Sequence, residues 1–381
     1  MLYATRSARL TPFRPPRGES LSTGRPLIRT STLRAMGVLF GAHDAYLLHD
    51  PGAGHPESPR RLRAVAEGIA AAGFAEGVVP FEPRRATDVE LDRVHHPRYV
   101  AALARLCSAG GGRLDPDTAV VAASEEAARR AAGAGPDAIA RLRAGEADAA
   151  FLALRPPGHH ARPSGAMGFC LFNNVAVAAA ALVAEGERVL ILDWDAHHGN
   201  GTQEAFYEEP EVLFFSLHQY PYYPGTGALD EVGAGAGEGR TINLPFPAGT
   251  SGDAYRAAFD EVLAPAAEQF APTWLLVSAG FDAHRADPLT DLGLTSGDFA
   301  DLAARAARLV PPGRRLFFLE GGYDLEALGR SAAATLGALL GVDYRPEPPT
   351  AGGPEGGPTL AAQAVARAAG QLHERSERRR S

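Results

Sequence analysis

Four residues with polar side chains closely follow an apolar run in the middle of the sequence. Residues 189–192 are apolar throughout, as expected for a strand buried on both faces. Asp193, Asp195, His197 and His198 follow at once. A single aspartate there would be interpreted as a helix cap, but a cluster of this kind at a strand's carboxyl end favours a bound metal or ligand. Asp195 and His197 alternate along the chain and can point the same way, and this oxygen and nitrogen pair suits zinc or a similar divalent ion.

Other strand candidates also end in polar motifs. Candidates at 148–154, 188–193, 212–217, 274–279 and 315–320 alternate with helical stretches, which predicts an α/β fold with a parallel sheet covered by helices on both faces. These strands run into the motifs 155–161, 193–200, 216–218, 279–284 and 320–323. The carboxyl ends of parallel strands meet at one edge of the sheet, so we expect the motifs to form one active site.

Several residues of these motifs are candidates for chemistry, each with a structural alternative. Asp282 is the expected third metal ligand, or else a turn or N-cap aspartate. His159 and His160 follow a stiff Pro-Pro-Gly turn, and each needs a partner of its own unless the pair is structural. Tyr323 follows two glycines that let the backbone approach a ligand, with a packed aromatic as the alternative. Phe169 either lines a narrow tunnel or fills the core.

Helix signals fall between the strand candidates. Ser58 and Pro59 predict a helix start and Gly73 its end. Asn173 and Asp324 are predicted caps for two later helices. Further helices are expected near 97–107, 124–144, 173–185, 252–270, 295–309 and 324–340.

Composition narrows the class of protein. The chain has 381 residues, 45% of them hydrophobic, and no apolar run reaches the roughly 18 residues of a membrane span. The net charge of −8 disfavours nucleic-acid binding. Cys107 and Cys170 are the only cysteines, which excludes a cysteine-rich zinc site and fits a reducing cytoplasm.

Both ends of the chain differ from the middle. Residues 1–35 hold seven arginines and one acidic residue, and are either a non-native extension upstream of a start at Met36 or an organellar transit peptide. We expect a catalytic domain at 36–343. Residues 344–381 are predicted to be a Pro/Gly-rich linker, at 345–358, and a peripheral helix after it.

The motifs together resemble the histone deacetylase superfamily. The similarity lies in residues 156–161, 168–174, 193–201, 279–282 and 320–323, with 55–57 and 94–100 in support. Within the superfamily the chain resembles class II-like bacterial deacetylases and acetylpolyamine amidohydrolases. Asn200, where class I members carry Asp, and the loop 223–227 support this placement.

The resemblance implies the arginase/deacetylase fold, with a central parallel sheet of about eight strands. It implies Zn²⁺ on Asp195, His197 and Asp282. It also implies a structural K⁺ held by Asp193, Ser216 and the backbone carbonyls of Asp195, His197 and Leu217, and a more remote K⁺ near Phe206 and Val212.

The same resemblance implies a role for each catalytic residue. His160 is expected to be the general base, oriented by Asn200, and His159 is expected to pair with Asp193 and stabilise charge. Tyr323 is expected to donate a hydrogen bond to the developing oxyanion. The substrate would be bound by Gly168 and Phe169 in an acyl tunnel, and by Asp117 unless that residue is a turn aspartate.

The expected reaction is hydrolysis of an N-acetyl amide to acetate and a free amine. The expected substrate is an acetyl-lysine protein or an acetylated polyamine or other small amine, and the enzyme is expected to act either as a monomer or as a homo-oligomer. Leu289 argues mildly against polyamines, because some polyamine-selective relatives carry a glutamate near this position. A ureohydrolase is one alternative, although Gly199 stands where its motif has a further aspartate. A non-catalytic acetyl-binding module is the other.

Overall fold

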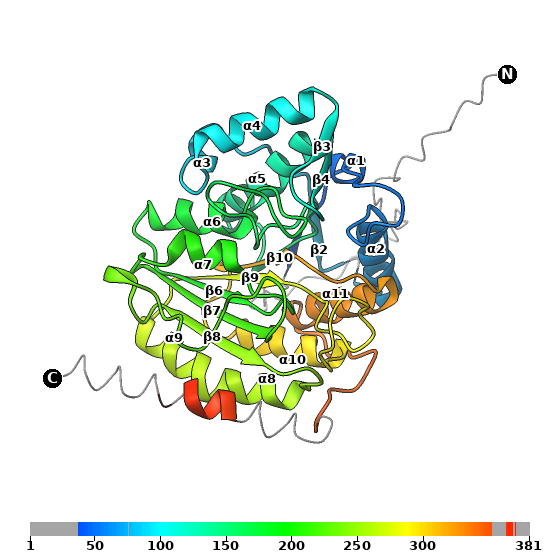
Figure 1. Ribbon diagram of the computed structural model, residues 1–381. Coiled ribbons are helices and arrows are strands. Elements are labelled where there is room, and N and C mark those ends of the chain that lie inside the picture. The colour runs from blue at the N-terminus through cyan, green and yellow to red at the C-terminus, as the bar shows by residue number, and fades with distance from the viewer. Residues whose placement is uncertain (1–36, 75, 353–362, 369, 371–381) are drawn as a thin grey trace, which may run out of the picture. The chain divides into compact units, whose positions relative to one another are not determined.

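An eight-stranded parallel sheet forms the centre of the protein, which we describe from a computed structural model (Figure 1). The structure describes residues 37–74, 76–352, 363–368 and 370, so the extension 1–35 lies outside the described residues. The strand order is β2-β1-β5-β10-β9-β6-β7-β8. The strands are β1 Val38–Gly41, β2 Val78–Phe81, β5 Ala149–Leu152, β6 Val189–Asp193, β7 Val212–Gln219, β8 Thr241–Phe246, β9 Trp274–Ala279 and β10 Arg315–Leu319. A separate antiparallel hairpin pairs β3 Gly111–Arg113 with β4 Ala119–Val121.

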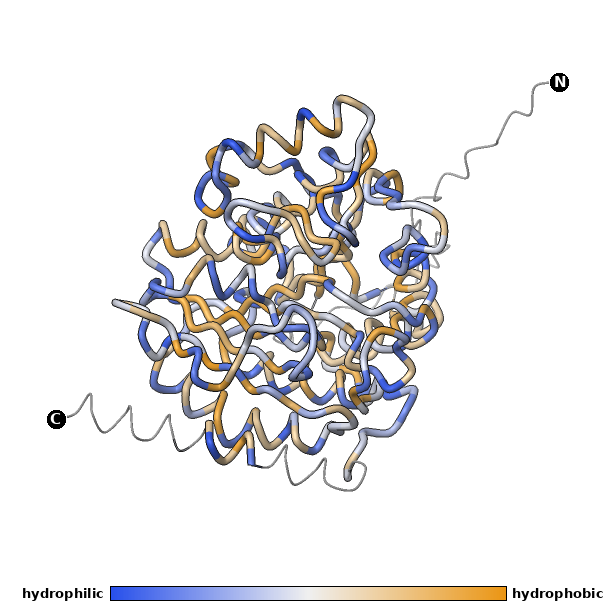
Figure 2. Tube along the Cα trace, in the orientation of Figure 1, coloured by the Kyte–Doolittle hydropathy of each residue, from blue (hydrophilic) through white to orange (hydrophobic). Residues whose placement is uncertain are grey.

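Helices cover both faces of this sheet (Figure 1). One layer contains α3 Asp88–Leu91, α4 Pro97–Ser108, α5 Ser124–Arg143, α6 Asn174–Val183 and α7 Asn200–Phe206, with the short α1 Ala45–Leu48 beside α5. The other contains α2 Arg60–Ala72, α8 Gly252–Ala258, α9 Ala264–Phe270, α10 Ser296–Ala306 and α11 Leu325–Leu339. Because helices cover both faces, the central strands are mostly apolar, and Figure 2 shows hydrophobic colour along them.

The five predicted strands are confirmed, and three further strands complete the sheet. The strands β1, β2 and β8 lie toward its two edges. Pro80 interrupts β2 and Pro245 interrupts β8, and proline in an apolar run argues against a strand when only the sequence is known.

The helix signals were largely correct. Asn173 accepts a hydrogen bond from the amide of Ala176, and Asp324 accepts one from Ala327, as expected for caps. The helix expected to start at Ser58–Pro59 begins at Arg60 instead, and it has no side-chain cap. The stretch 252–270 is helical throughout, but a π-helical segment, Phe259–Leu263, separates α8 from α9.

The first part of the predicted linker is anchored to the domain. Glu347 accepts hydrogen bonds from His284 and Ser296, and Thr350 donates to Asp298. Residues 363–368 and 370 are helical, and the remainder of the predicted linker and helix lies outside the described residues. None of the helices in the described residues is long and apolar enough to span a membrane.

Candidate active site

The five polar motifs follow five strands that are neighbours in the sheet. The order β5-β10-β9-β6-β7 places the motifs side by side at the carboxyl edge, as the sequence predicts. In register, Asp193 at the end of β6 lies beside Ser278 of β9 and Ser216 of β7. The site is therefore assembled from residues up to 168 positions apart that the parallel pairing brings together.

The three expected metal ligands converge. The donor atoms of Asp195, His197 and Asp282 all lie within 4.8 Å of one another. Nδ1 of His197 is 3.2 Å from Oδ1 of Asp195 and 3.0 Å from Oδ2 of Asp282. Both carboxylates are fully buried. Their other oxygens accept backbone hydrogen bonds from Gly321 and Ala196 respectively, which fixes their orientation.

This donor set fits a divalent cation. Burial raises the pKa of Asp282, and the charge of Asp195 raises it further, so the buried pair of carboxylates favours a nearby positive charge. One nitrogen and two oxygens are suitable ligands for zinc, and three protein ligands leave positions for water and substrate. Among the described residues, the donor atoms of His159, Cys170 and Glu320 also lie within 4.8 Å of one another.

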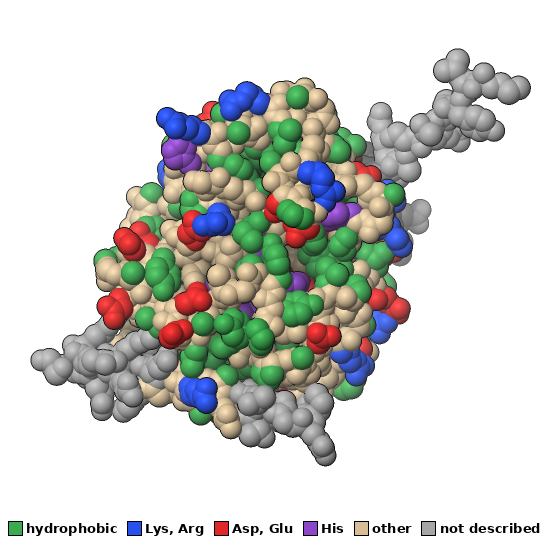
Figure 3. Space-filling view, in the orientation of Figure 1, with side chains coloured by type: hydrophobic (Ala, Val, Ile, Leu, Met, Phe, Trp, Pro, Cys, Tyr) green, Lys and Arg blue, Asp and Glu red, His purple; other side chains and the backbone are tan. Residues whose placement is uncertain are grey.

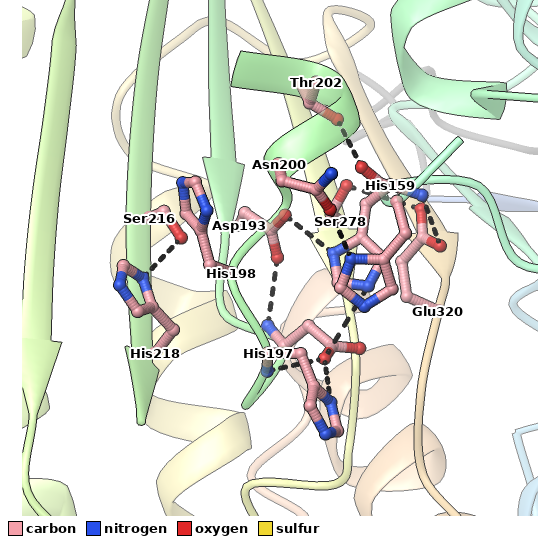
Figure 4. A network of polar contacts seen from close by, with 12 residues as sticks. His159, Asp193, His197, His198, Asn200, Thr202, Ser216, His218, Ser278 and Glu320 are labelled. Atoms are coloured by element: carbon pink, nitrogen blue, oxygen red, sulfur yellow. Dashed lines mark hydrogen bonds and ion pairs between the residues drawn. The ribbon is translucent and has the colours of Figure 1, made fainter. Parts of the chain in front are cut away.

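The paired histidines have different partners, as expected. Nδ1–H of His159 donates to Oδ2 of Asp193 at 3.0 Å, and Nδ1–H of His160 donates to Oδ1 of Asn200 at 2.8 Å. The amide nitrogen of Asn200 donates in turn to the sulfur of Met167, consistent with this orientation of the amide. Figure 4 shows His159, Asp193 and Asn200 grouped above His197.

These partners separate the pKa values of the two rings. Burial alone would lower the pKa of His159, but the charges of Asp195 and Asp193 outweigh burial and raise it to about 10. Burial lowers the pKa of His160 well below its usual value, and the charge of His159 lowers it further. One ring therefore favours the imidazolium form and the other the neutral form.

A cavity of about 400 Å³ leads to this cluster. Its lining includes the predicted residues Asp117, His160, Gly168, Phe169, His197 and Tyr323. The rings of Phe169 and Tyr323 meet edge to face with centroids 5.8 Å apart. Phe169 has φ of +67°, an uncommon conformation for a residue with a side chain, and it occurs here in the cavity wall. Figure 3 shows small patches of histidine among hydrophobic side chains near the centre of the face in view.

Two cavity residues were not predicted as site residues. Tyr222 and Tyr223 line the cavity with Leu289, and the ring of Tyr223 stands perpendicular to that of His160 at 5.2 Å. The hydroxyl of Tyr222 donates to the carbonyl of Leu289 at 2.7 Å. The sequence of the loop 223–227 supports the family resemblance, but it does not indicate which way an aromatic side chain in the loop faces. A larger groove of about 540 Å³, between α2 and α11, contains none of the motif residues.

The ring of His218, which lies 4.8 Å from that of His198, determines that the hydroxyl of Ser216 is a hydrogen-bond donor. Nε2–H of His218 donates to the carbonyl of Gly227 at 2.9 Å, so Nδ1 of the neutral ring is an acceptor. The hydroxyl of Ser216 lies 2.9 Å from that Nδ1 and must donate to it. The oxygen of Ser216 keeps its lone pairs for another partner.

Comparisons with known proteins identify the family of this chain. A family model described as the histone deacetylase domain matches residues 55–339. The chain is 40% identical over 314 residues to a probable deacetylase of Archaeoglobus fulgidus, covering 81% of this chain and 87% of that protein. It is 39% identical over 296 residues to a histone deacetylase-like amidohydrolase of Pseudomonas aeruginosa, covering 76% and 78% respectively.

A solved structure is similar along most of the chain. The crystal structure of the HDA15 HD domain has a TM-score of 0.82 and 38% identity to this chain, and the match covers 89% of this chain and 95% of that one. The fold is therefore the arginase/deacetylase fold that the motifs imply. The chain belongs to the histone deacetylase family. Membership supports deacetylase activity on an acetylated substrate.

Proposed function

We propose that the protein is a zinc-dependent deacetylase that hydrolyses N-acetyl amides of primary amines. The observation that carries the proposal is the convergence of Asp195, His197 and Asp282 beside a histidine pair with opposite protonation preferences. Asp195, His197 and Asp282 would hold the zinc. When bound, zinc supplies a Lewis acid for the acetyl carbonyl and lowers the pKa of the attacking water.

The histidine pair would move the protons. Nδ1 of His160 carries its proton toward Asn200, so Nε2 of the neutral ring is free to accept a proton from water and later give it to the leaving amine. Asn200 is uncharged and orients the ring without stabilising the imidazolium as a carboxylate would. His159, held by Asp193, would remain positively charged and stabilise negative charge that develops nearby.

Tyr323 and the cavity walls would bind the acetyl group. Tyr323 faces the cavity, where its hydroxyl would donate to the developing oxyanion. Phe169 would form one wall of an acyl tunnel. Gly168 would keep the tunnel open, because a Cβ there would lie 2.4 Å from the ring of His160. Asp117 lies at the same cavity and would contact the substrate beyond the acetyl-bearing nitrogen.

A structural K⁺ would lie beside the zinc site, between β6 and β7. Its ligands would be Asp193, Ser216 and the backbone carbonyls of Asp195, His197 and Leu217. Asp193 and Ser216 are register partners, and the lone pairs of the Ser216 oxygen support this assignment. The more remote K⁺ near Phe206 and Val212 and a cytoplasmic location stay predictions.

The alternative functions are less compatible with the site. A further aspartate at position 199, as in the ureohydrolase motif, would have no room, because a Cβ on Gly199 would lie 2.2 Å from Oδ2 of Asp193. Binding of an acetyl group without catalysis does not require a neutral histidine base beside a positively charged imidazolium.

The experiment that tests the proposal compares two substrates. The kcat/KM of the zinc-loaded protein is measured on an acetyl-lysine peptide and on N-acetylputrescine, and acetate release is expected from at least one. A tenfold preference corresponds to about 1.4 kcal/mol of differential transition-state binding. Leu289 at the cavity favours the peptide, because an aliphatic side chain offers nothing to a distal ammonium. Acetate release from neither substrate, with zinc bound, would overturn the proposal.

A further inference from the structure

The short segment that carries Tyr323 is fastened through its main chain. It joins β10 to α11 and contains two glycines, and Gly322 has φ of +117°. The carbonyl of Gly321 accepts from the amide of Phe281 at 3.0 Å, and the carbonyl of Gly322 accepts from Nε–H of Arg61 at 2.7 Å. Glycines give the backbone little stiffness of its own, so the position of Tyr323 depends on such contacts.

Asp287 makes the contact nearest to the tyrosine. Its Oδ2 accepts hydrogen bonds from the amides of Tyr323 at 2.6 Å and Asp324 at 3.3 Å. Its Oδ1 accepts from the amide of Leu289 at 3.0 Å. Asp287 is 7% exposed, and all three donors are backbone N–H groups.

We propose that Asp287 is a positioning residue that holds Tyr323 at the reaction site through its backbone amide. This inference rests on the proposed function of Tyr323 as the oxyanion donor. Asp287 would not contact the substrate itself, since it does not line the cavity that contains Tyr323.

The two carboxyl oxygens of Asp287 suit this task better than an amide side chain, because both of them accept backbone hydrogen bonds. A buried Asn at this position would offer only one oxygen, and its NH₂ group would face an N–H donor. At least one of the three amides would then lose its partner.

The same carboxylate joins the tyrosine to a metal-ligand loop. Asp287 lies in the segment that follows β9, five residues after Asp282, and Leu289 in this segment lines the cavity. The hydroxyl of Thr290 donates to the carbonyl of Asp282 within the same segment. The oxyanion donor and the third metal ligand are therefore held in one hydrogen-bonded unit.

The first test is the kinetics of Asp287→Asn. We expect kcat to fall by roughly ten- to a hundredfold, because small displacements of a catalytic group cost this much, with KM little changed. Asp291→Asn is the matched control, since Asp291 lies in the same loop but accepts from Gln219 and not from the tyrosine segment. The control is expected to keep wild-type kcat. An unchanged kcat in Asp287→Asn would overturn the proposal.

The second test separates positioning from general damage. If Asp287 acts through the hydroxyl of Tyr323, then Asp287→Asn should cause no further fall in kcat in a Tyr323→Phe background. An equal fall in both backgrounds would contradict the proposal. Asp287→Glu keeps the carboxyl group but displaces its oxygens, and it replaces Asp287→Asn in both tests if that variant does not fold.

The third test does not depend on activity. Hydrogen exchange of the peptide that contains Tyr323 and Asp324 should be faster in Asp287→Asn than in the wild type, and unchanged in Asp291→Asn. Unchanged exchange in Asp287→Asn would overturn the proposal even if the wild type released no acetate. If the wild type releases no acetate but exchange is faster in Asp287→Asn, the contact between Asp287 and the tyrosine segment is supported and the proposed function is refuted.

Discussion

At the residue scale, the proposed chemistry depends on the hydroxyl of Tyr323. The ring centroid lies 5.8 Å from that of Phe169 and 5.0 Å from the guanidinium of Arg61. Burial raises the pKa of the Tyr323 hydroxyl well above its usual value, so the group keeps its proton and remains a donor. The two contacts restrict the orientation of the ring.

Removing this hydroxyl should strongly reduce turnover without reducing the amount of bound zinc. Tyr323→Phe keeps the ring and its packing, and kcat should fall by about 10²–10³, the usual effect of losing one oxyanion donor. Zinc content measured by atomic absorption should match the wild type. Wild-type turnover in this variant would show that the hydroxyl has no part in the reaction.

The pH dependence of kcat/KM should change when the residue that accepts the hydrogen bond from His160 is replaced. In Asn200→Asp, a carboxylate would favour the imidazolium and raise the pKa of His160. Since the neutral ring is the proposed base, the acid limb of the kcat/KM profile should move to higher pH, and activity should be lost first at low pH. Measuring kcat/KM against pH for both proteins checks this, and a limb that stays in place or moves to lower pH would contradict the assigned base.

Most of the candidate site could be predicted at this scale, and some residues could not. Asp195, His197 and Asp282 stand at strand ends, where residue type and position together carry the signal. Asp287 and Tyr222 act through contacts with residues 36 and 67 positions away. Nothing in their local sequence indicates those contacts.

At the element scale, the turn after β10 leaves no room for a side chain beside the proposed metal ligands Asp195 and Asp282. A Cβ on Gly321 would lie 2.1 Å from Oδ2 of Asp282 and 2.6 Å from Oδ2 of Asp195. The turn after β10 must therefore be made by glycine for the two carboxylates to keep their positions.

Gly321→Ala should therefore weaken metal binding. Displacing two oriented ligands should lower zinc affinity by roughly 10–100-fold, the effect usually seen when the support of a ligand is lost. Gly165→Ala is the control, because a Cβ there meets nothing within 4 Å. Competition with a chelator measures both affinities, and equal affinity in Gly321→Ala and wild type would refute the steric argument.

A buried ion cluster joins the start of α2 to the turn after β5. Glu57 accepts hydrogen bonds from Nη2 of Arg155 at 2.7 Å and from Nη1 of Arg61 at 3.2 Å, and all three side chains are fully buried. Burial would raise the pKa of Glu57, but the Arg155 guanidinium outweighs it and lowers the pKa to about 2. The resulting stabilisation is present above the ordinary carboxyl pKa and is lost as the pH falls toward 2.

Breaking this cluster should destabilise the fold. Glu57→Gln leaves two buried guanidinium groups without their counter-charge, and the free energy of unfolding should fall by about 3–5 kcal/mol. In Glu326→Gln, which breaks an exposed pair with Arg330, the change should stay within about 0.5 kcal/mol. Urea unfolding near neutral pH compares the two, and equal effects would show that the buried cluster contributes no more than the exposed pair.

Strands and helices could be predicted where the apolar pattern and the cap residues lie within one short segment of the sequence. The central strands are long apolar runs, and the caps at Asn173 and Asp324 are local signals. The strands β2 and β8 contain proline, and their place in the sheet is fixed only by pairing with β1 and β7. The strand order of the sheet likewise depends on contacts that no single segment encodes.

At the scale of the whole molecule, the fold brings five polar strand ends to one edge of a rigid sheet. Two helix layers exclude water from the sheet, so buried carboxylates at this edge are held in a medium where charge pairing is strong. If this edge binds zinc to hydrolyse an acetyl amide, as we propose, activity and metal should be lost and regained together.

The most direct measurement is acetate release from an acetyl-lysine peptide and from N-acetylputrescine by one preparation, before and after the metal is removed and zinc is returned. We expect release by the zinc-loaded protein, none by the metal-free protein, and recovery with about one zinc per chain, as for a catalytic site with three protein ligands. Acetate release that persists in the metal-free protein, or no release with zinc bound, would show that the protein is not a zinc-dependent deacetylase.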